Sequence, residues 1–373
     1  MEVQPVTKIT KAPAFMTDFG QATRYTLDNG TIRTDICDFG ALILTLLVPD
    51  RAGRLADVVL GYDGYEGYRE RVTFFGAAVG RCCNRIGKGR FTLNGKQYQL
   101  ACNDHGVNHL HGGNSGLDQK LWSAEVVSGK TGDELRLTTF MADGEESYPG
   151  RLDVMLTVSL TEDNGLSLHY EAVCDTDTIC NLTNHSFFNL AGHDTGDMLG
   201  QKLRLFAGRY TETDDALIPT GRILPVEGTP LDFRTFHTIG ERIAKTAHGG
   251  YDNNYVIDAH NGLFICAQAY DEVSGRFMEC LTTCPCVQLY TANGLDASGG
   301  KGGAHYGNHA GFCLETQYAP DAVNHPEWTW TSPILRAGSR YDQTTIYRFK
   351  NDPCAGEDVA GAFFVNKDGE KNS

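Results

Sequence analysis

Two side chains suited to proton transfer lie in otherwise apolar, strand-like runs of the sequence. His185 belongs to residues 181–190, which read NLTNHSFFNL, and it is the only side chain of that run that exchanges a proton near neutral pH. Glu315 belongs to residues 311–320, which read GFCLETQYAP. Burial among apolar neighbours would raise the pKa of the Glu315 carboxyl and make it a better base near neutral pH. An acid and a base in one cleft would predict a reaction that moves protons.

Both residues also have a structural interpretation. A single histidine in a β-protein is commonly a core residue that is hydrogen-bonded to neighbouring amides, and a buried glutamate is commonly paired. The run around His185 is unusually polar for a core, because Asn184, Ser186 and Asn189 flank the histidine. This polarity favours a functional role.

Two groups of residues have the chemistry of metal ligands. The first consists of three cysteines, namely Cys280, Cys284 and Cys286. The second consists of acidic and imidazole side chains, namely Asp104, His105, His109 and His111. The cysteines lack paired C-x-x-C spacing, and the second group matches no standard zinc motif and lies among glycines and asparagines typical of an irregular loop. We therefore predict no metal site, and metal binding stays a minor alternative at each group.

The elements that must position these residues are predicted to be β-strands. Turn residues between β-forming runs predict four hairpins, within residues 24–33, 91–100, 154–173 and 263–281. The first two turn at Asn-Gly, the strongest local hairpin signal. Residues 41–48 form an apolar run of strand length, and residues 239–247 are predicted to be a short helix. Many short strands with almost no helical periodicity predict an all-β sandwich or barrel.

The sequence shows neither an internal repeat nor a Pro/Ser-rich linker, so we predict one domain over residues 1–349. Within it, residues 1–19 are expected to be a loose N-terminal arm. Residues 350–373 shift to Gly, Asp, Glu, Lys and Asn and are expected to be an extension, for which the sequence gives no function.

Charge and composition restrict the partners. The formal net charge of −15 and the lack of a Lys/Arg cluster argue against binding to nucleic acid or an anionic membrane. No apolar run approaches the roughly 18 residues of a membrane span, and the first residues do not read as a signal sequence. The twelve cysteines are spread along the chain and are expected to be reduced. We therefore expect a cytoplasmic protein with a neutral small-molecule partner.

Several separate motifs carry a family resemblance. Residues 80–89 (GRCCNRIGKG), 110–113 (LHGG), 181–190 and 312–324 stand in the order found in the aldose 1-epimerases, also called galactose mutarotases, and the chain resembles this family from about residue 31 to residue 349. The resemblance implies a large twisted β-sandwich of the galactose mutarotase-like type. It also implies an isomerase that interconverts the α and β anomers of free aldohexoses such as galactose and glucose without a cofactor.

The same resemblance implies roles for individual residues. Glu315 would be the general base that takes the proton of the C1 hydroxyl, and His185 the general acid that protonates the ring oxygen, so that the ring opens, rotates about C1–C2 and recloses. Both would line one hexose-sized hollow, from opposite sides. The sugar would be bound by polar side chains at Asn84, Arg85, His111, Asp252 and Gln288.

The sequence departs from the family pattern at two positions. Asn253 stands where a histidine is expected, and Phe187 stands where relatives often have tyrosine. Losing a phenol removes one hydrogen-bond donor but keeps the bulk of the ring, so activity is expected to survive. Arg81, near the Asn84–Arg85 pair, is expected to be structural.

Two other functions remain open at this point. A sugar-binding or sensing protein would use the same cleft without turnover, although a pure binder needs neither an acid nor a base. A glycosidase usually needs two carboxylates, and only Glu315 has a strong setting. We expect a monomer or weak dimer, and the sequence leaves the preferred sugar open.

Overall fold

The computed structural model of the protein describes residues 6–258 and 262–351. The regular structure of these residues is mostly β-strand, arranged as one sheet of nine strands, two sheets of five and several two-stranded pairs. We call the sheet of nine the long sheet. The α-helix found in the described residues is α1 (Tyr65–Arg69), and the other helical turns are short 3-10 segments.

The three larger sheets have the following strand orders. The long sheet consists of β11 (Ser123–Ser128), β12 (Asp133–Met141), β13 (Leu152–Leu160), β14 (Gly165–Cys174), β27 (Arg340–Lys350), β23 (Phe277–Thr282), β22 (Phe264–Tyr270), β17 (Lys202–Leu205) and β20 (His237–Thr238). The sheet that we call the N-terminal sheet consists of β1 (Lys8–Thr17), β2 (Gly20–Asp28), β3 (Arg33–Cys37), β4 (Leu42–Pro49) and β5 (Leu55–Asp57). The sheet that we call the site sheet consists of β19 (Pro219–Pro225), β18 (Arg209–Thr213), β21 (Asp252–Val256), β24 (Cys286–Tyr290) and β25 (Cys313–Gln317).

The remaining strands are short and pair two by two. They are β6 (Ala78–Val79) with β16 (Thr183–Asn184), β7 (Arg85–Ile86) with β10 (His109–Leu110), β8 (Arg90–Leu93) with β9 (Lys96–Gln99), and β15 (Thr178–Ile179) with β26 (Ile334–Leu335).

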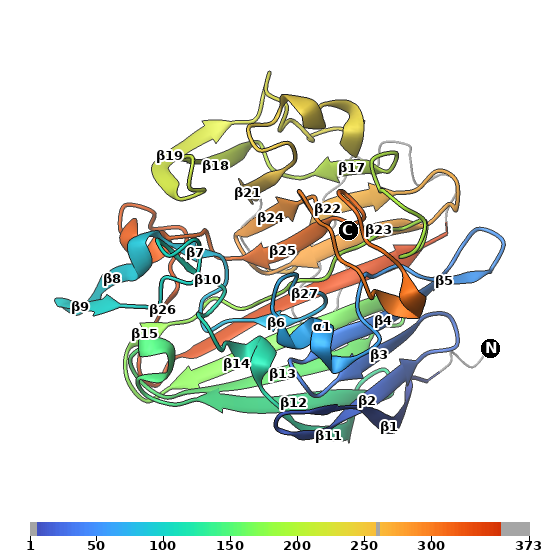
Figure 1. Ribbon diagram of the computed structural model, residues 1–373, viewed down its shortest axis with the longest axis horizontal. Coiled ribbons are helices and arrows are strands. Elements are labelled where there is room, and N and C mark those ends of the chain that lie inside the picture. Colours follow the sequence, from blue (N-terminus) through green and yellow to red (C-terminus); the bar gives the residue numbers. More distant parts are fainter. Residues whose placement is uncertain (1–5, 259–261, 352–373) are drawn as a thin grey trace.

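The three larger sheets share one hydrophobic core. A contiguous buried cluster takes Leu46 from the N-terminal sheet, Leu156 and Tyr170 from the long sheet, and Val287 and Leu314 from the site sheet. In Figure 1 the N-terminal sheet lies toward the β11–β14 end of the long sheet and the site sheet toward the β22–β17 end. The two smaller sheets thus cover the long sheet, which makes the large β-sandwich that the sequence predicts.

All four predicted hairpins are present. β2 pairs with β3, β8 with β9, β13 with β14, and β22 with β23, each in antiparallel register. The predicted strand at residues 41–48 is β4. The turn residues between the strands determine these pairs, so the hairpins can be predicted from the sequence without knowledge of the fold.

Two predictions about local structure are wrong. The N-terminal residues are not a loose arm over their whole length, because β1 pairs with β2 from Lys8↔Asp28 to Thr17↔Gly20. Residues 239–247 form two 3-10 turns, Ile239–Glu241 and Ile243–Lys245, and no α-helix. The C-terminal extension lies outside the described residues from residue 352 onward.

Candidate active site

Strand alternation in the site sheet concentrates polar side chains on one face. Neighbouring strands bring Asn254, Gln288 and Glu315 into one row, because Asn254 pairs with Gln288 and Gln288 pairs with Glu315. Successive side chains of a strand point to opposite faces, so Leu314 and Val287 point the other way, into the shared core. The site sheet therefore holds a hydrophobic face and a polar face, and Glu315 stands on the polar one.

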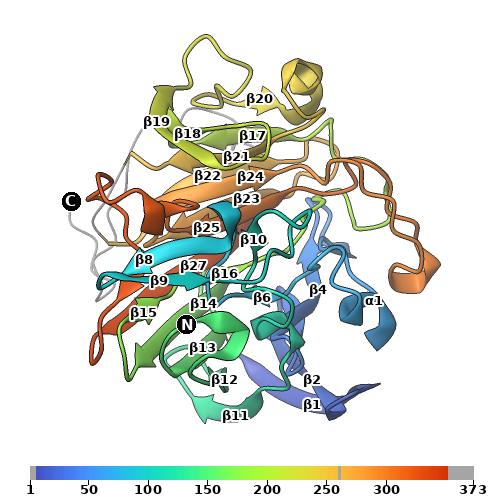
Figure 2. The same cartoon turned by 60° about the vertical axis from the view of Figure 1, so that its left-hand side comes forward.

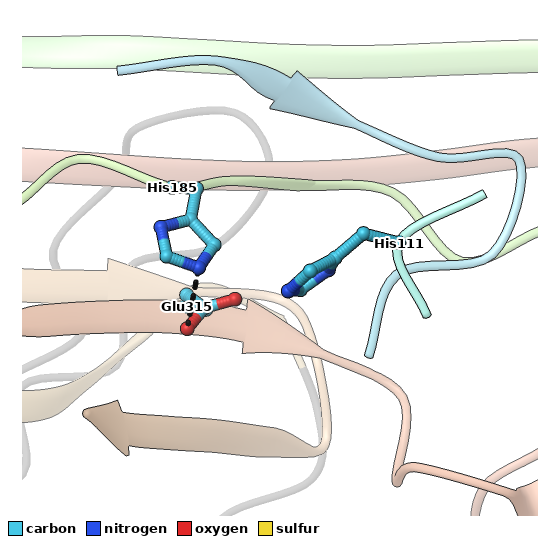
Figure 3. A group of neighbouring side chains, drawn as sticks. All are labelled: His111, His185 and Glu315. Carbon is cyan, nitrogen blue, oxygen red and sulfur yellow. Dashed lines mark ion pairs between the residues drawn. The ribbon is translucent and has the colours of Figure 1, made fainter. Parts of the chain in front are cut away.

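His185 is carried to the same face by the short β16 strand. β16 pairs with β6 and contacts β25, beside which it lies in Figure 2. The backbone N–H of His185 donates to Ala77 O (2.9 Å), and its carbonyl accepts from the Gly76 N–H (3.1 Å). These bonds direct the imidazole toward Glu315, as Figure 3 shows, with 3.6 Å between His185 Nε2 and Glu315 Oε1.

The two groups lie side by side, and the expectation of a hexose-sized hollow between them is wrong. A separation of 3.6 Å leaves no room for a sugar ring between Nε2 and Oε1. The physical reason is that Glu315 and His185 come from segments that pack directly on each other, since β16 contacts β25. A substrate would therefore meet both groups from one side.

Burial moves the pKa values of this pair in opposite directions. His185 is 6% exposed and Glu315 is 2% exposed. Loss of hydration penalises the charged form of each group, so the pKa of His185 falls to about 4 and the pKa of Glu315 rises well above its usual range. Glu315 Oε2 is also buried without a hydrogen-bond partner, which is unusual for a carboxylate oxygen.

His111 completes the cluster and its tautomer follows from its contacts. The N–H of Asn84 donates to His111 Nδ1 at 3.1 Å, so Nδ1 carries no proton and the neutral ring carries it on Nε2. Gly112, which follows it, has a φ of +83°, and a Cβ there would lie 2.0 Å from Gly80 O. Glycine is therefore required where the His111 loop crosses the residues 80–84 segment.

Three side chains that could bind a metal ion meet at this point, but their other contacts do not suit a metal ion. Atoms of His111, His185 and Glu315 lie within 4.8 Å of one another. A metal-bound histidine normally donates its second ring N–H to an acceptor, but the second nitrogen of His111 faces a donor, the Asn84 N–H. The donor set therefore fits hydrogen bonding to a ligand better than it fits metal coordination.

The metal alternatives from the sequence do not assemble either. Both ring nitrogens of His109 are occupied, Nδ1 by Ala101 O (2.8 Å) and Nε2 by the Tyr148 hydroxyl (2.5 Å). His105 is highly exposed, with its side chain 93% accessible. Within the part of the chain that the structure describes, Cys280, Cys284 and Cys286 are buried free thiols and form no metal-ligand group.

The predicted sugar-binding residues form a connected polar group beside Glu315. Gln288 Nε2 donates to Asp252 Oδ1 at 2.6 Å, and Arg85 NH1 lies 3.7 Å from Asp252 Oδ2. Arg85 Nε also donates to Asp104 Oδ2 at 3.0 Å. Burial raises the pKa of Asp252, and the Arg85 charge opposes that rise. Asp104, which the sequence indicated only as a possible metal ligand, instead orients the guanidinium.

Comparison with known proteins identifies the family. The family model "Aldose 1-epimerase" matches residues 23–348. The galactose mutarotase of Bos taurus is 42% identical over 332 residues, which are 88% of this chain and 94% of the relative. The aldose 1-epimerase of Escherichia coli is 32% identical over 348 residues, 91% of this chain and 99% of the relative. This chain belongs to the aldose 1-epimerase family.

A solved aldose epimerase homologue from C. elegans has the same fold. It superposes with a TM-score of 0.80 at 27% identity and covers 92% of this chain and 99% of its own. The predicted fold class, an all-β sandwich of the galactose mutarotase-like type, is therefore confirmed. No helix in the described residues is both long enough and apolar enough to cross a membrane.

The two departures from the aldose 1-epimerase pattern have local explanations. Phe187 is 2% exposed and packs on His185, with 5.1 Å between ring centroids, so the phenylalanine keeps the bulk that the site needs. Asn253 alternates with Asp252 along β21, and its Oδ1 accepts the Asp252 N–H at 3.3 Å. Asn253 thus supports the backbone of the aspartate from the other face.

Arg81 is structural, as predicted from its position in the family motif. Its guanidinium is fully buried and donates to the carbonyls of Met141, Pro149 and Gly150. It ties the residues 80–84 segment to the β12–β13 connection.

Sequence reasoning missed the aromatic side chains around the imidazoles. Phe74 lies 4.9 Å from the His111 ring and 5.8 Å from the His185 ring, and Tyr290 lies 6.4 Å from His185, measured between centroids. Tyr290 lies two residues after Gln288 along β24 and therefore on the same face, so a period-two reading around Gln288 would have found it. No local signal marks Phe74.

Proposed function

We propose that this protein is an aldose 1-epimerase that interconverts the α and β anomers of free aldohexoses such as galactose and glucose. The observation that carries the proposal is the buried Glu315 carboxyl, whose Oε2 lacks a partner while His185 Nε2 lies 3.6 Å from Oε1. A sugar hydroxyl that reaches Oε2 would supply the missing hydrogen bond.

The side-by-side arrangement suits this reaction. O1 and the ring oxygen O5 are bonded to the same carbon, so the groups that serve them must also be close together. Glu315 takes the O1 proton while His185 Nε2 gives a proton to O5, and the C1–O5 bond breaks to give the aldehyde. Rotation about C1–C2 and reclosure with the two roles exchanged give the other anomer. Each positioned proton-transfer group contributes about 10²–10⁴-fold to the rate.

His111 and the polar group around Asp252 have supporting roles in the proposal. The Nε2–H of neutral His111 would donate to the ring oxygen or a neighbouring hydroxyl. Asp252 would accept hydroxyl protons, while Arg85 and Gln288 hold its carboxylate and offer their remaining N–H groups to the sugar.

The pair works while it holds one proton between its two members. Burial favours that proton on Glu315 in the empty site, so it must pass to His185 Nε2 before Glu315 takes the O1 proton. A second proton removes the base, and the low pKa of His185 places that step near pH 4. Loss of the single proton removes the acid, and the raised pKa of Glu315 delays that step toward alkaline pH. The rate should therefore follow a broad bell in pH, whose two apparent pKa values belong to the pair.

Polarimetry of freshly dissolved α-galactose tests the proposal. The protein should accelerate the approach to the equilibrium rotation, and Glu315→Gln or His185→Ala should each lower the acceleration by about 10²–10⁴-fold. His169→Ala and Glu272→Gln are matched controls, because both residues pair at the protein surface with Asp342 and Lys202, respectively. Both controls should keep the wild-type rate.

Three outcomes would reject the proposal. Near-normal rates in both site variants would reject the assigned roles. Saturable galactose binding by the wild-type protein without any acceleration would indicate a sugar-binding protein. Release of a coloured product from a nitrophenyl galactoside would indicate a glycosidase.

We also propose a cytoplasmic location. Asn181 and Asn184 each begin an Asn-x-Ser/Thr glycosylation sequence, and both are buried, so a glycan at either would prevent this fold. The cysteines of the described residues are free thiols, as expected in a reducing compartment. Fractionation with a compartment marker tests the location, and recovery in a secreted or organellar fraction would contradict it.

A further inference from the structure

The aromatic ring of Phe74 packs against the imidazoles of both His111 and His185. Its ring contacts both His111 and His185, at centroid distances of 4.9 and 5.8 Å, whereas the two imidazoles lie 5.1 Å from each other. The ring is only half-buried, although the histidines beneath it are almost fully buried. The Phe74 ring therefore covers part of both imidazoles and is itself partly exposed to solvent.

The backbone around Phe74 is hydrogen-bonded to the segment that carries His185. The Phe74 carbonyl accepts the Ala77 N–H, the Gly76 N–H donates to His185 O, and the His185 N–H donates to Ala77 O. Any shift of this turn would therefore move the backbone of the histidine.

Arg71 ties the same turn to the loop that carries His111. Its guanidinium donates to both carboxylate oxygens of Asp118, at 2.6 and 2.9 Å, and to Gly113 O at 2.6 Å. It also lies 5.1 Å from the centroid of the Phe74 ring, within cation–π range. The turn thus connects both histidine-bearing segments.

The turn adopts a backbone conformation that aromatic residues seldom take. Phe74 and Arg71 both have a φ of +55°. A bulky residue in the left-handed region is an outlier that persists only where its surroundings impose it. The contacts of Arg71, Gly76 and Ala77 supply that constraint. They hold the Phe74 ring against the two imidazoles.

We propose that Phe74 is a positioning residue of the site, whose ring holds His111 and His185 in place beside Glu315 and keeps water away from both imidazoles. The inference rests on the proposed function for its kinetic consequence, but the effect on histidine hydration does not depend on turnover. Phe74 acts through the histidines and transfers no proton itself.

The groups around His185 make the consequence testable. Glu315 and Cys313 face it from β25, with Cys313 Sγ 3.8 Å from Nδ1, Tyr290 faces it from β24, and His111 faces it from the loop after β10. Beyond these, Arg71 lies over Phe74, and the charges of Asp252 and Arg85 act on Glu315. The dominant influence on the His185 pKa is burial, so removal of the covering ring should raise that pKa from about 4 toward the ordinary value.

The experiment compares wild type with Phe74→Ala and Phe74→Leu in two measurements. The first is the pH dependence of galactose mutarotation, and the second is the NMR titration of the His185 ring without sugar. Phe74→Ala should lower kcat about 10-fold, with a smaller change in KM, and should shift both the acid limb and the His185 titration to higher pH. Phe74→Leu keeps apolar bulk and should recover most of both properties.

Tyr98→Ala is the matched control, because Tyr98 is also a half-buried aromatic residue, stacked on Phe91 at 5.1 Å. It should leave the acid limb and the His185 titration unchanged. A folded Phe74→Ala protein with an unshifted His185 titration would overturn the inference, whatever its rate. If the alanine variant does not fold, Phe74→Gly takes its place, because glycine suits the φ of +55° at this position, and an unshifted His185 titration in that variant would overturn the inference equally. A wild-type protein without mutarotase activity would reject the proposed function, and the NMR titration would still decide the role of Phe74.

Discussion

At the scale of single residues, the site is built from groups that the fold holds in unfavourable surroundings. Glu315 has a buried oxygen without a partner, and His185 is buried beside it. Both conditions cost folding free energy, because buried polar groups are normally bonded. The same conditions make the groups useful, since a desolvated carboxyl binds protons more strongly than a hydrated one and responds to a hydroxyl placed next to it.

Because the buried Glu315 carboxyl costs folding free energy, we predict that Glu315→Gln will stabilise the protein while it abolishes most activity. The folded pKa of Glu315 lies above the unfolded value, so the wild-type side chain is tolerated best when protonated, and its destabilising effect grows as pH rises above about 4.5. The variant should be more stable than wild type by about 1–3 kcal/mol at pH 8, and the difference should vanish below about pH 4.5. Urea unfolding at both pH values measures this, and a variant that is less stable at pH 8 would contradict it.

Asp252→Asn should act on binding and on the alkaline limb of the pH profile. The amide keeps an acceptor for Gln288 but loses its charge for Arg85, which lies 3.7 Å away. Loss of one charged hydrogen-bond acceptor should raise KM about 10- to 100-fold. The Asp252 charge also contributes to the raised pKa of Glu315, so its removal should move the alkaline limb to lower pH. Initial rates over galactose concentration and pH test both effects, and an unchanged KM would exclude Asp252 from the sugar contacts.

The residues of the site differ in how far the sequence reveals them. His185 and Glu315 stand out because each is a titratable group in an apolar run. Phe74 and the orienting role of Asp104 depend on contacts between segments far apart in the chain, and no local pattern encodes such contacts. The His111 tautomer likewise depends on a backbone N–H at Asn84, which only the folded loop brings into reach.

At the scale of elements, the site sheet separates stability from chemistry by strand alternation. Leu314 is 1% exposed and lies in the core, although its neighbours Cys313 and Glu315 point to the site. Leu314→Ala should therefore destabilise the protein by about 2–5 kcal/mol while kcat per folded molecule stays near the wild-type value. Thermal unfolding and rates below the transition test this. A large loss of kcat in the fully folded variant would show that the hydrophobic and polar faces of the site sheet are coupled.

The elements themselves were predictable where turn chemistry or length gave a signal, as in the β2–β3 and β8–β9 hairpins. The two-residue strands β6 and β16 were not, because two residues carry no periodicity and their pairing joins positions about a hundred residues apart. β1 was missed because its residues alternate irregularly, including a register shift between Pro13 and Met16. These weakly signalled strands include the one that carries His185 to Glu315.

At the scale of the whole molecule, the net charge of −15 favours a neutral substrate. The summed negative potential should repel an anionic aldose such as galacturonate on approach, and salt should screen that repulsion over a Debye length of about 8–10 Å at physiological ionic strength. We expect kcat/KM for galactose to be nearly independent of ionic strength. The ratio of kcat/KM for galactose to that for galacturonate should fall about 10-fold between low and high salt. Polarimetry of both sugars over a salt series measures the ratio. A ratio that stays constant would mean that contacts within the site, and not the field of the molecule, decide between the two sugars, with Arg85 beside Asp252 as the first residue to test.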